Sequence, residues 1–290
     1  VTGMHMLTEY GSTHTEIDKF FKSGVIKFKN QIVGDKLEKI LTETIQKFSK
    51  VVKEIKPDLI IIHGDRVEPL ACALVGSLNH ILTAHIEGGE VSGTIDESIR
   101  HAITKFSNFH FPASKDAEER IIKLGENPDS VFCVGCPRID LVSEIIHKND
   151  NLEMKNVFEK GVGREFDLNE KFLILSQHPV TTEFGDGESQ IRTTLESIQE
   201  IGIPALVLWP NADAGSNDIS RGIRKWREKM NCDLFYFVKN LPVTTYITLM
   251  QKTACLVGNS SSGIREGSFI GTPTVNIGTR QNNRERGLNV

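Results

Sequence analysis

The sequence lacks the features that would indicate a membrane or a nucleic acid as partner. No apolar run approaches the roughly 20 residues needed to span a bilayer, and the N-terminal segment 1–5 lacks the basic and then apolar pattern of a signal peptide. The net charge of −4 argues against a general electrostatic grip on nucleic acid. Aromatic residues are scattered and form no stacking platform or membrane stripe. These absences predict neither a nucleic-acid partner nor a membrane partner, and they leave a phosphorylated small molecule open.

The sequence also lacks a disulfide framework, because its 5 cysteines are odd in number and irregularly spaced. Cys133 and Cys136 form a C-x-x-C, but a zinc ribbon would need a second such pair. The run 131–134 is typical of a buried strand, so we interpret these cysteines as small buried hydrophobes. The chain is therefore expected in a reducing, cytoplasmic compartment.

What the sequence does have is an alternation of short apolar runs with helix-length amphipathic segments. A length of 290 residues suits two domains, and 39% hydrophobic with 25% charged residues is typical of a globular protein. Continuous apolar runs suit strands buried on both faces, so the alternation predicts an α/β fold with parallel sheets. The segment 36–55 has helical spacing and ends before Pro57. The predicted strands are 58–63, 81–86, 109–112, 131–134, 172–176, 205–209, 234–238, 254–257 and 274–277.

The alternation stops between about residues 147 and 170, where no strand is readable. We place the division between two Rossmann-like domains there, at 1–147 and 148–290. Two such halves predict a cleft between them, and ligands of open α/β sheets bind beyond the carboxyl ends of the strands.

Three acidic residues of the first half lie next to predicted strand ends or glycine-rich turns. Asp65 follows the strand 58–63, Glu87 follows 81–86 and precedes two glycines, and Asp96 lies a few residues further on. Each has a structural alternative: Asp65 could cap a helix, and Asp96 could belong to a capping box at 94–97. A charge at a buried strand end needs a partner or a purpose, and carboxylates in unlike environments supply an acid and a base. Spacing alone leaves capping and catalysis equally favoured.

The second half has a polar turn, 258–263, between the strand 254–257 and a helix predicted over 264–269. Free N–H groups and the hydroxyls of this turn would suit a phosphate, and Glu266 could reach ribose hydroxyls. An ordinary capped helix start explains the turn equally well. His178 also ends an apolar strand, and Arg280 lies in an arginine-rich loop that suits anions or simply solvent.

Seven motifs together resemble UDP-N-acetylglucosamine 2-epimerases, and they span nearly the whole chain. They are the segments 63–66, 85–90, 92–101, 177–182, 210–211, 213–216 and 258–261. The run 88–96 is similar to the hydrolysing branch, which releases UDP and N-acetylmannosamine for sialic acid synthesis. The resemblance implies two Rossmann-like domains in the glycosyltransferase-B arrangement, with the N-terminal strand of that fold missing here.

The resemblance also implies site residues. Asp65, Glu87 and Asp96 match the catalytic acids of the family. The resemblance leaves open which of the three removes the proton from C2 of the sugar. Glu87 and Asp96 are candidates for the later hydration step. We expect these three to matter more for turnover than for folding. Residues expected around UDP are Arg66, His178, Asn211, Leu241, Ser260, Ser261, Glu266 and Arg280.

Within that set, the two serines would hold the diphosphate, Glu266 the ribose and Leu241 the uracil edge. The resemblance implies no cofactor, neither a metal nor a nicotinamide. It does imply a homodimer or homotetramer. Three alternatives stay open. One is the same reaction on a UDP- or GDP-linked 2,4-diacetamido-2,4,6-trideoxy hexose. A second is a non-hydrolysing epimerase, which the run 89–93 disfavours. The third is a nucleotide-sugar-binding module without turnover.

Overall fold

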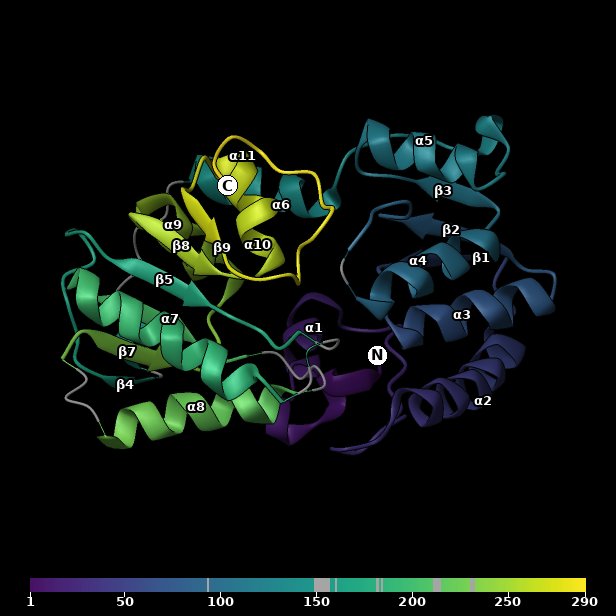
Figure 1. Cartoon of the computed structure of the whole chain (residues 1–290). Coiled ribbons are helices and arrows are strands. Elements are labelled where there is room, and N and C mark those ends of the chain that lie inside the picture. Colours follow the sequence, from purple (N-terminus) through teal and green to yellow (C-terminus); the bar gives the residue numbers. More distant parts are fainter. Residues whose placement is uncertain are drawn as a thin grey trace. The chain divides into compact units, whose positions relative to one another are not determined.

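The structure is a computed structural model, and it describes residues 1–92, 94–148, 157–159, 161–180, 183, 185–210, 215–229 and 233–290. The chain divides into two compact units (Figure 1). The first comprises Val1–Val91 with Ile95–Cys136, and the second comprises Ser92–Thr94 with Pro137–Val290. The domain boundary predicted at 147 stays a prediction.

The first unit is built on a 3-stranded parallel sheet in the order β1-β2-β3. Its strands are β1 (Leu59–His63), β2 (Leu82–Ile86) and β3 (Phe109–Phe111). The helical segments that precede, connect and follow them are η1 (Gly3–Met6), η2 (Thr8–Tyr10), α1 (His14–Phe20), α2 (Leu37–Ile55), α3 (Val67–Leu78), α4 (Ile95–Lys105), α5 (Lys115–Lys123) and η3 (Pro128–Ser130). Helix α3 joins β1 to β2 and α4 joins β2 to β3, so the carboxyl ends of these strands lie at one edge of the sheet.

The second unit is built on a 6-stranded sheet in the order β4-β7-β6-β5-β8-β9, in which only β4 runs antiparallel among the strands described. The strands are β4 (Gly161–Gly163), β5 (Leu173–Ser176), β6 (Ala205–Leu208), β7 (Phe235–Val238), β8 (Cys255–Gly258) and β9 (Thr274–Asn276). The helices are α6 (Pro137–Lys148), α7 (Gly187–Ile201), α8 (Ser216–Lys229), α9 (Val243–Lys252), α10 (Ser261–Ile264) and α11 (Glu266–Ile270). The strand order reverses between β5 and β8, which makes their carboxyl ends a topological switch point.

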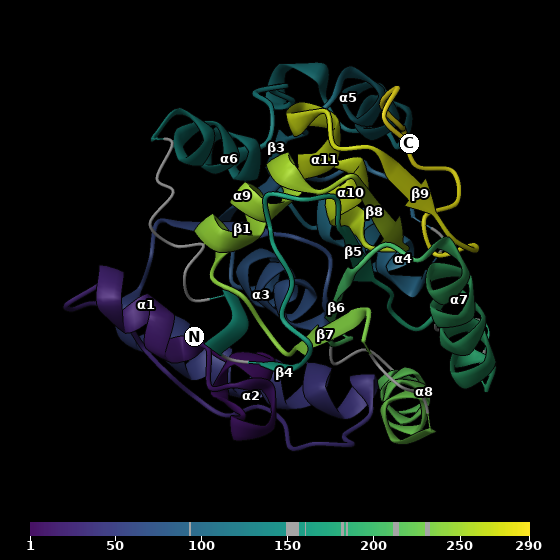
Figure 2. The same cartoon turned by 90° about the vertical axis from the view of Figure 1, so that its left-hand side faces the viewer.

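The second sheet is buried on both faces, as its continuous apolar strands predict. Leu173 and Leu175 of β5 pack with α7 and α8, whereas Ile174 packs on the opposite face with α6 and α9. Figure 2 shows these two helical layers on either side of the sheet. In β1 of the first unit, by contrast, Ile60 and Ile62 enter the core while Leu59 and Ile61 are 43% and 65% exposed. The apolar run of β1 is therefore half-buried.

Two sequence predictions about strands are wrong. In the run 131–134 only Val131 makes a β-bridge, to His110, and Phe132 and Val134 are exposed. Phe132 stacks instead on Phe111, with 5.7 Å between ring centroids. Conversely, β4 lies where no strand was readable. It is a glycine-containing strand that pairs with β7, and it has too few side chains to show an alternating pattern.

The helix predicted over 36–55 is confirmed by α2, which ends at Lys56 in a left-handed conformation before Pro57. The helix predicted over 264–269 is corrected to two short helices. Ser260 caps α10, and the chain bends at Arg265 before α11 begins at Glu266. Within the described parts of the chain, no helix combines the length and apolar composition needed to cross a bilayer.

Candidate functional site

Glu87 occupies a sharp turn directly after β2. Its φ of 61° lies in the left-handed region, which is uncommon for residues other than glycine. The backbone N–H donates to the carbonyl of Phe111 over 3.0 Å, which fixes the turn against the end of β3. The residue is only 3% exposed, yet both carboxylate oxygens have partners. Oε2 lies 3.2 Å from His63 Nε2, and Oε1 accepts from the thiol of Cys136 over 2.8 Å.

The two glycines after Glu87 lie so close to neighbouring side-chain and backbone atoms that a Cβ at either position would clash with them. A Cβ on Gly88 would lie 2.8 Å from His85 Nδ1. Gly89 has a φ of +79°, and a Cβ there would lie 2.3 Å from the carbonyl oxygen of Ala117 in α5. The guanidinium of Arg120 donates to the Gly89 carbonyl over 2.6 Å. The turn that carries Glu87 is thus packed directly onto α5.

The buried side chain of His85, which belongs to β2, contacts both the loop that follows β1 and helix α4. Its Nε2 lies 3.0 Å from the carbonyl oxygen of Gly64, and its Nδ1 lies 3.2 Å from Oγ1 of Thr104. Burial lowers the pKa of His85 to about 4, so the ring is neutral at pH 7. A neutral imidazole donates from one nitrogen and accepts at the other, and both of these contacts can then be satisfied.

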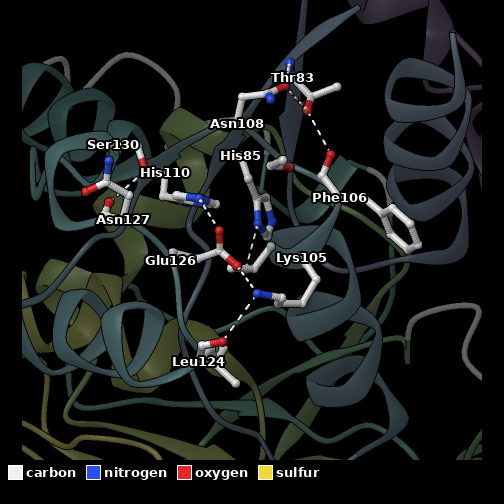
Figure 3. A network of polar contacts seen from close by, with 12 residues as sticks. Thr83, His85, Lys105, Phe106, Asn108, His110, Leu124, Glu126, Asn127 and Ser130 are labelled. Atoms are coloured by element: carbon white, nitrogen blue, oxygen red, sulfur yellow. Dashed lines mark hydrogen bonds and ion pairs between the residues drawn. The ribbon is translucent and has the colours of Figure 1, made fainter. Parts of the chain in front are cut away.

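A second polar network supports β2 and β3 from the far ends of α4 and α5 (Figure 3). Buried His110 of β3 lies 3.4 Å from a carboxylate oxygen of Glu126, which also pairs with Lys105 of α4. Burial lowers the pKa of His110, with the charge of Glu126 opposing that shift. Asn108 accepts from the backbone N–H of Thr83 over 2.9 Å. These contacts hold together the strands that end in Glu87 and its turn.

Asp65 pairs with a buried cation. The guanidinium of Arg100 in α4 donates to the Asp65 carboxylate and, over 2.9 Å, to the carbonyl of Glu90. The Arg100 side chain is 1% exposed, whereas that of Asp65 is 29% exposed. The capping alternative for Asp65 does not hold, because α3 is preceded by Arg66 as its N-cap, without a side-chain cap bond.

Asp96 lies in the first turn of α4 and is half-buried. Arg100 follows it by one helical turn, so the two side chains share a face of the helix. Because Arg100 reaches Asp65 after β1, the first turns of α4 lie at the strand ends. The structure therefore brings Asp65 and the α4 segment together, and it places Glu87 at the end of the neighbouring strand β2.

In the second unit, the loops after β5 and β8 are joined at the topological switch point. The side chain of Asn259 accepts from the backbone N–H of His178 over 2.7 Å and donates to the His178 carbonyl over 2.8 Å. The backbone carbonyl of Asn259 accepts from Gln281 over 2.9 Å and from Arg280 over 3.2 Å. His178 and Arg280 are thereby gathered around the start of the serine-rich turn.

The serine-rich turn carries a chain of hydroxyl contacts. Ser260 Oγ lies 2.9 Å from Ser262 Oγ, which lies 2.7 Å from the hydroxyl of Tyr246 in α9. Burial raises the pKa of Tyr246, so its hydroxyl stays protonated. Ser261, the first residue of α10, is half-buried between its two neighbours. This turn presents hydroxyls and backbone N–H groups beyond β8, a composition suited to anion binding.

Glu266 is 7% exposed and begins α11. Its Oε1 lies 3.5 Å from Nη1 of Arg138 in α6, and its Oε2 is buried without a hydrogen-bond partner in the described structure. Leu241 is partly buried against the core near α9, whereas Arg66 lies exposed in the first unit, with its Nε 3.9 Å from Glu68. Asn211 lies outside the described residues.

Sequence reasoning missed the partners of the acidic residues. His63 and Arg100 were visible only as parts of motifs, Cys136 was interpreted as a buried hydrophobe, and Arg138 was not singled out. Their signal is weak because each lies far along the chain from its partner: 49 residues separate Cys136 from Glu87, and 128 separate Arg138 from Glu266. Among the residues described, no cluster of three His, Cys, Asp or Glu side chains could hold a metal ion.

Two Rossmann-like units, with acidic strand ends in one and a hydroxyl-rich switch point in the other, define the α/β class of this protein. A sequence profile of the UDP-N-acetylglucosamine 2-epimerase family matches residues 1–290, and the chain belongs to that enzyme family. It is 34% identical over 290 residues to a UDP-N-acetylglucosamine 2-epimerase of Neisseria meningitidis serogroup B, covering 100% of this chain and 74% of the relative.

A Campylobacter jejuni relative, named GDP/UDP-N,N'-diacetylbacillosamine 2-epimerase (hydrolyzing), is 36% identical over 296 residues, covering 100% of this chain and 74% of the relative. The crystal structure of UDP-GlcNAc 2-epimerase from Neisseria meningitidis bound to UDP-GlcNAc has a TM-score of 0.78 at 16% identity, covering 93% of this chain and 73% of that chain. The predicted family and α/β fold class are thus confirmed.

Proposed function

We propose that this protein is a hydrolysing UDP-N-acetylglucosamine 2-epimerase, converting UDP-GlcNAc and water to N-acetylmannosamine and UDP. The observation that carries the proposal is the contrast between two carboxylates after neighbouring parallel strands. Glu87 is buried beside His63 and Cys136, whereas Asp65 is partly exposed beside Arg100. Carboxylates in such different environments can divide the roles of acid and base between them. The hydrolysing C. jejuni relative supports water as the second reactant.

The reaction needs two proton transfers at C2 of the sugar. In the first step a carboxylate removes the C2 proton, the bond from C1 to UDP breaks with its electron pair leaving on the phosphate, and 2-acetamidoglucal forms. In the second step water adds its oxygen to C1, and a proton returns to the opposite face of C2. Asp65, Glu87 and Asp96 are the proposed catalytic residues, with Glu87 and Asp96 acting in the hydration step.

The second unit is proposed to bind the UDP portion. Ser260 and Ser261 would hold the diphosphate with the hydroxyls and N–H groups of their turn, and Glu266 would accept from ribose hydroxyls. The unpartnered Oε2 of Glu266 supports this role, since a buried carboxylate oxygen needs a donor. Leu241 would contact the uracil edge. The proposed UDP-binding set is completed by His178, Asn211 and Arg280 of the second unit, and the resemblance also assigns Arg66 to it.

The deciding experiment is incubation with UDP-GlcNAc in deuterated water, followed by NMR. We expect free N-acetylmannosamine with deuterium at C2, together with UDP, because the proton added at C2 comes from exchangeable positions. Glu87→Gln should abolish the product, whereas Glu43→Gln on the surface of α2 makes the same chemical change away from the strand ends and should not. UDP-ManNAc as product would show a non-hydrolysing epimerase. Intact UDP-GlcNAc with bound UDP would show a binding module.

A second candidate substrate is a UDP- or GDP-linked 2,4-diacetamido-2,4,6-trideoxy hexose. The name of the C. jejuni relative, at 36% identity, favours it as much as the N. meningitidis relative, at 34%, favours UDP-GlcNAc. The same reaction would then release the diacetamido sugar with deuterium at C2. Comparing kcat/KM for the two nucleotide sugars would assign the substrate.

A sialic acid pathway, cytoplasmic location and homo-oligomeric assembly belong to the same proposal. The described cysteines are all free thiols, as expected in a reducing compartment. Light scattering on the purified protein would distinguish a homodimer or homotetramer from a monomer.

A further inference from the structure

Cys136 is a contact of the proposed catalytic centre that the mechanism above does not use. Its thiol donates to Oε1 of Glu87 over 2.8 Å, while His63 Nε2 lies 3.2 Å from Oε2 of the same carboxylate. One partner, His63, ends β1, and the other, Cys136, is the last residue of the first unit. Together they leave the Glu87 carboxylate little freedom to rotate about its terminal bond, because a different oxygen is engaged on each side.

The backbone around Cys136 holds the thiol in place. Gly135, with a φ of +87°, turns the chain directly before it, and Pro137 follows as the first residue of α6. Proline restricts its own φ and disfavours helical conformation in the preceding residue, so Cys136 is excluded from the helix. On the other side, Val131 bridges to β3 and Phe132 stacks on Phe111. Cys136 therefore sits between two anchored segments.

Arg138 makes the corresponding contact in the second unit. It lies two residues after Cys136, at the start of α6, and its guanidinium lies 3.5 Å from the carboxylate of Glu266. The first unit ends at Cys136 and the second resumes at Pro137. The segment 136–138, where the chain passes from the first unit to the second, thus supplies one partner to the proposed catalytic Glu87 and another to the proposed ribose ligand Glu266.

We propose that the segment Cys136–Arg138 positions both carboxylates: the Cys136 thiol holds Glu87 in its reactive orientation, and the Arg138 guanidinium orients Glu266 toward the nucleotide. The inference rests on the proposed function. It assigns Cys136 and Arg138 as positioning residues that act through these glutamates. A thiol is a weak, uncharged donor, so it orients the carboxylate without forming the ion pair that a lysine or arginine in its place would form.

The two contacts can be tested separately, because the Cys136 contact should affect kcat and the Arg138 contact should affect the Kd for UDP. Cys136→Ala should lower kcat about tenfold while leaving the Kd for UDP unchanged, and Cys136→Ser, which restores a donor, should recover kcat to within about threefold of wild type. Cys133→Ala, the other cysteine of the C-x-x-C, is the matched control and should keep wild-type kcat. Arg138→Met should raise the Kd for UDP, measured by calorimetry, about tenfold, with Arg138→Lys in between.

Glu87→Gln, assayed in parallel, separates the two hypotheses. Loss of turnover in Glu87→Gln with wild-type kcat in Cys136→Ala would overturn the positioning role alone, whereas full turnover in Glu87→Gln would overturn the proposed function itself. Equal losses in Cys136→Ala and Cys136→Ser, accompanied by a lowered melting temperature, would show packing in place of positioning. An unchanged Kd for UDP in Arg138→Met would likewise overturn the second contact.

Discussion

The pair formed by Asp65 and Arg100 predicts that Asp65 affects folding as well as catalysis. Asp65→Asn keeps the size of the side chain and a hydrogen-bond acceptor but removes its charge. Arg100, whose side chain is 1% exposed, then loses its ion pair with Asp65 and keeps the Glu90 carbonyl as an acceptor. Breaking a buried ion pair by removing one partner costs about 3–5 kcal/mol, because the remaining charge stays desolvated. Since Asp65 itself is 29% exposed and water can approach, we expect the lower end, about 3 kcal/mol.

The reverse substitution should cost less in electrostatic terms. Arg100→Met leaves a carboxylate that water can reach, and the methionine fills part of the vacated space. We expect about 2 kcal/mol, mostly from the Glu90 carbonyl and from imperfect packing. In the double variant neither charge of this pair remains, so its loss should be smaller than the sum of the two single losses.

The assay must read the first unit separately, because a two-unit protein need not unfold in one step. Both tryptophans, Trp209 and Trp226, lie in the second unit, so their fluorescence serves as an internal control. Native-state hydrogen exchange of the α4 amides reports the first unit. A loss of about 3 kcal/mol corresponds to a fall in α4 protection of about 100-fold.

The matched control is Asp129→Asn, which makes the same change at an exposed position of η3. We expect its effect to stay within about 0.5 kcal/mol. Wild-type protection of α4 in Asp65→Asn would refute the reasoning, and so would an equal loss in Asp129→Asn.

Three further predictions concern stability. As pH falls from 6.5 toward 4, His85 takes up a proton in the unfolded chain but stays neutral in the folded protein, because burial lowers its pKa to about 4. Up to about 3 kcal/mol of the free energy of unfolding should therefore be lost over this range. Urea unfolding measured at several pH values should show a weaker pH dependence of that free energy for His85→Gln. Gly89→Ala should lower the melting temperature more than Gly125→Ala, since both have positive φ but only Gly89 would bring a Cβ to 2.3 Å from a carbonyl oxygen; equal losses would contradict the packing argument. Tyr246→Phe should cost about 1 kcal/mol in tryptophan-monitored unfolding by removing the 2.7 Å contact with Ser262, and no change would show that the contact is energetically neutral.

Most strands and one long helix could be predicted from local pattern. The prediction of 36–55 as a helix agrees with α2 at Leu37–Ile55, and the run 58–63 agrees with β1 at Leu59–His63. These predictions succeed because helical and strand periodicities are local properties of the sequence. The strand β4 could not be found this way, since two of its three residues are glycines and its pairing with β7 comes from a distant segment.

The sequence by itself also determined that Asp65 and Glu87 follow strands and that serines follow another, because parallel strands bring their carboxyl ends to one edge. Only the tertiary structure decided what those groups touch. Arg100 reaches Asp65 from 35 residues away, and Cys136 reaches Glu87 from 49. Such contacts depend on how helices and loops pack after the sheet has formed, and no local periodicity records them. The run 131–134 looked like a buried strand because its apolar residues are contiguous, yet the fold exposes Phe132 and Val134 and uses Cys136, two residues further on, as a hydrogen-bond donor.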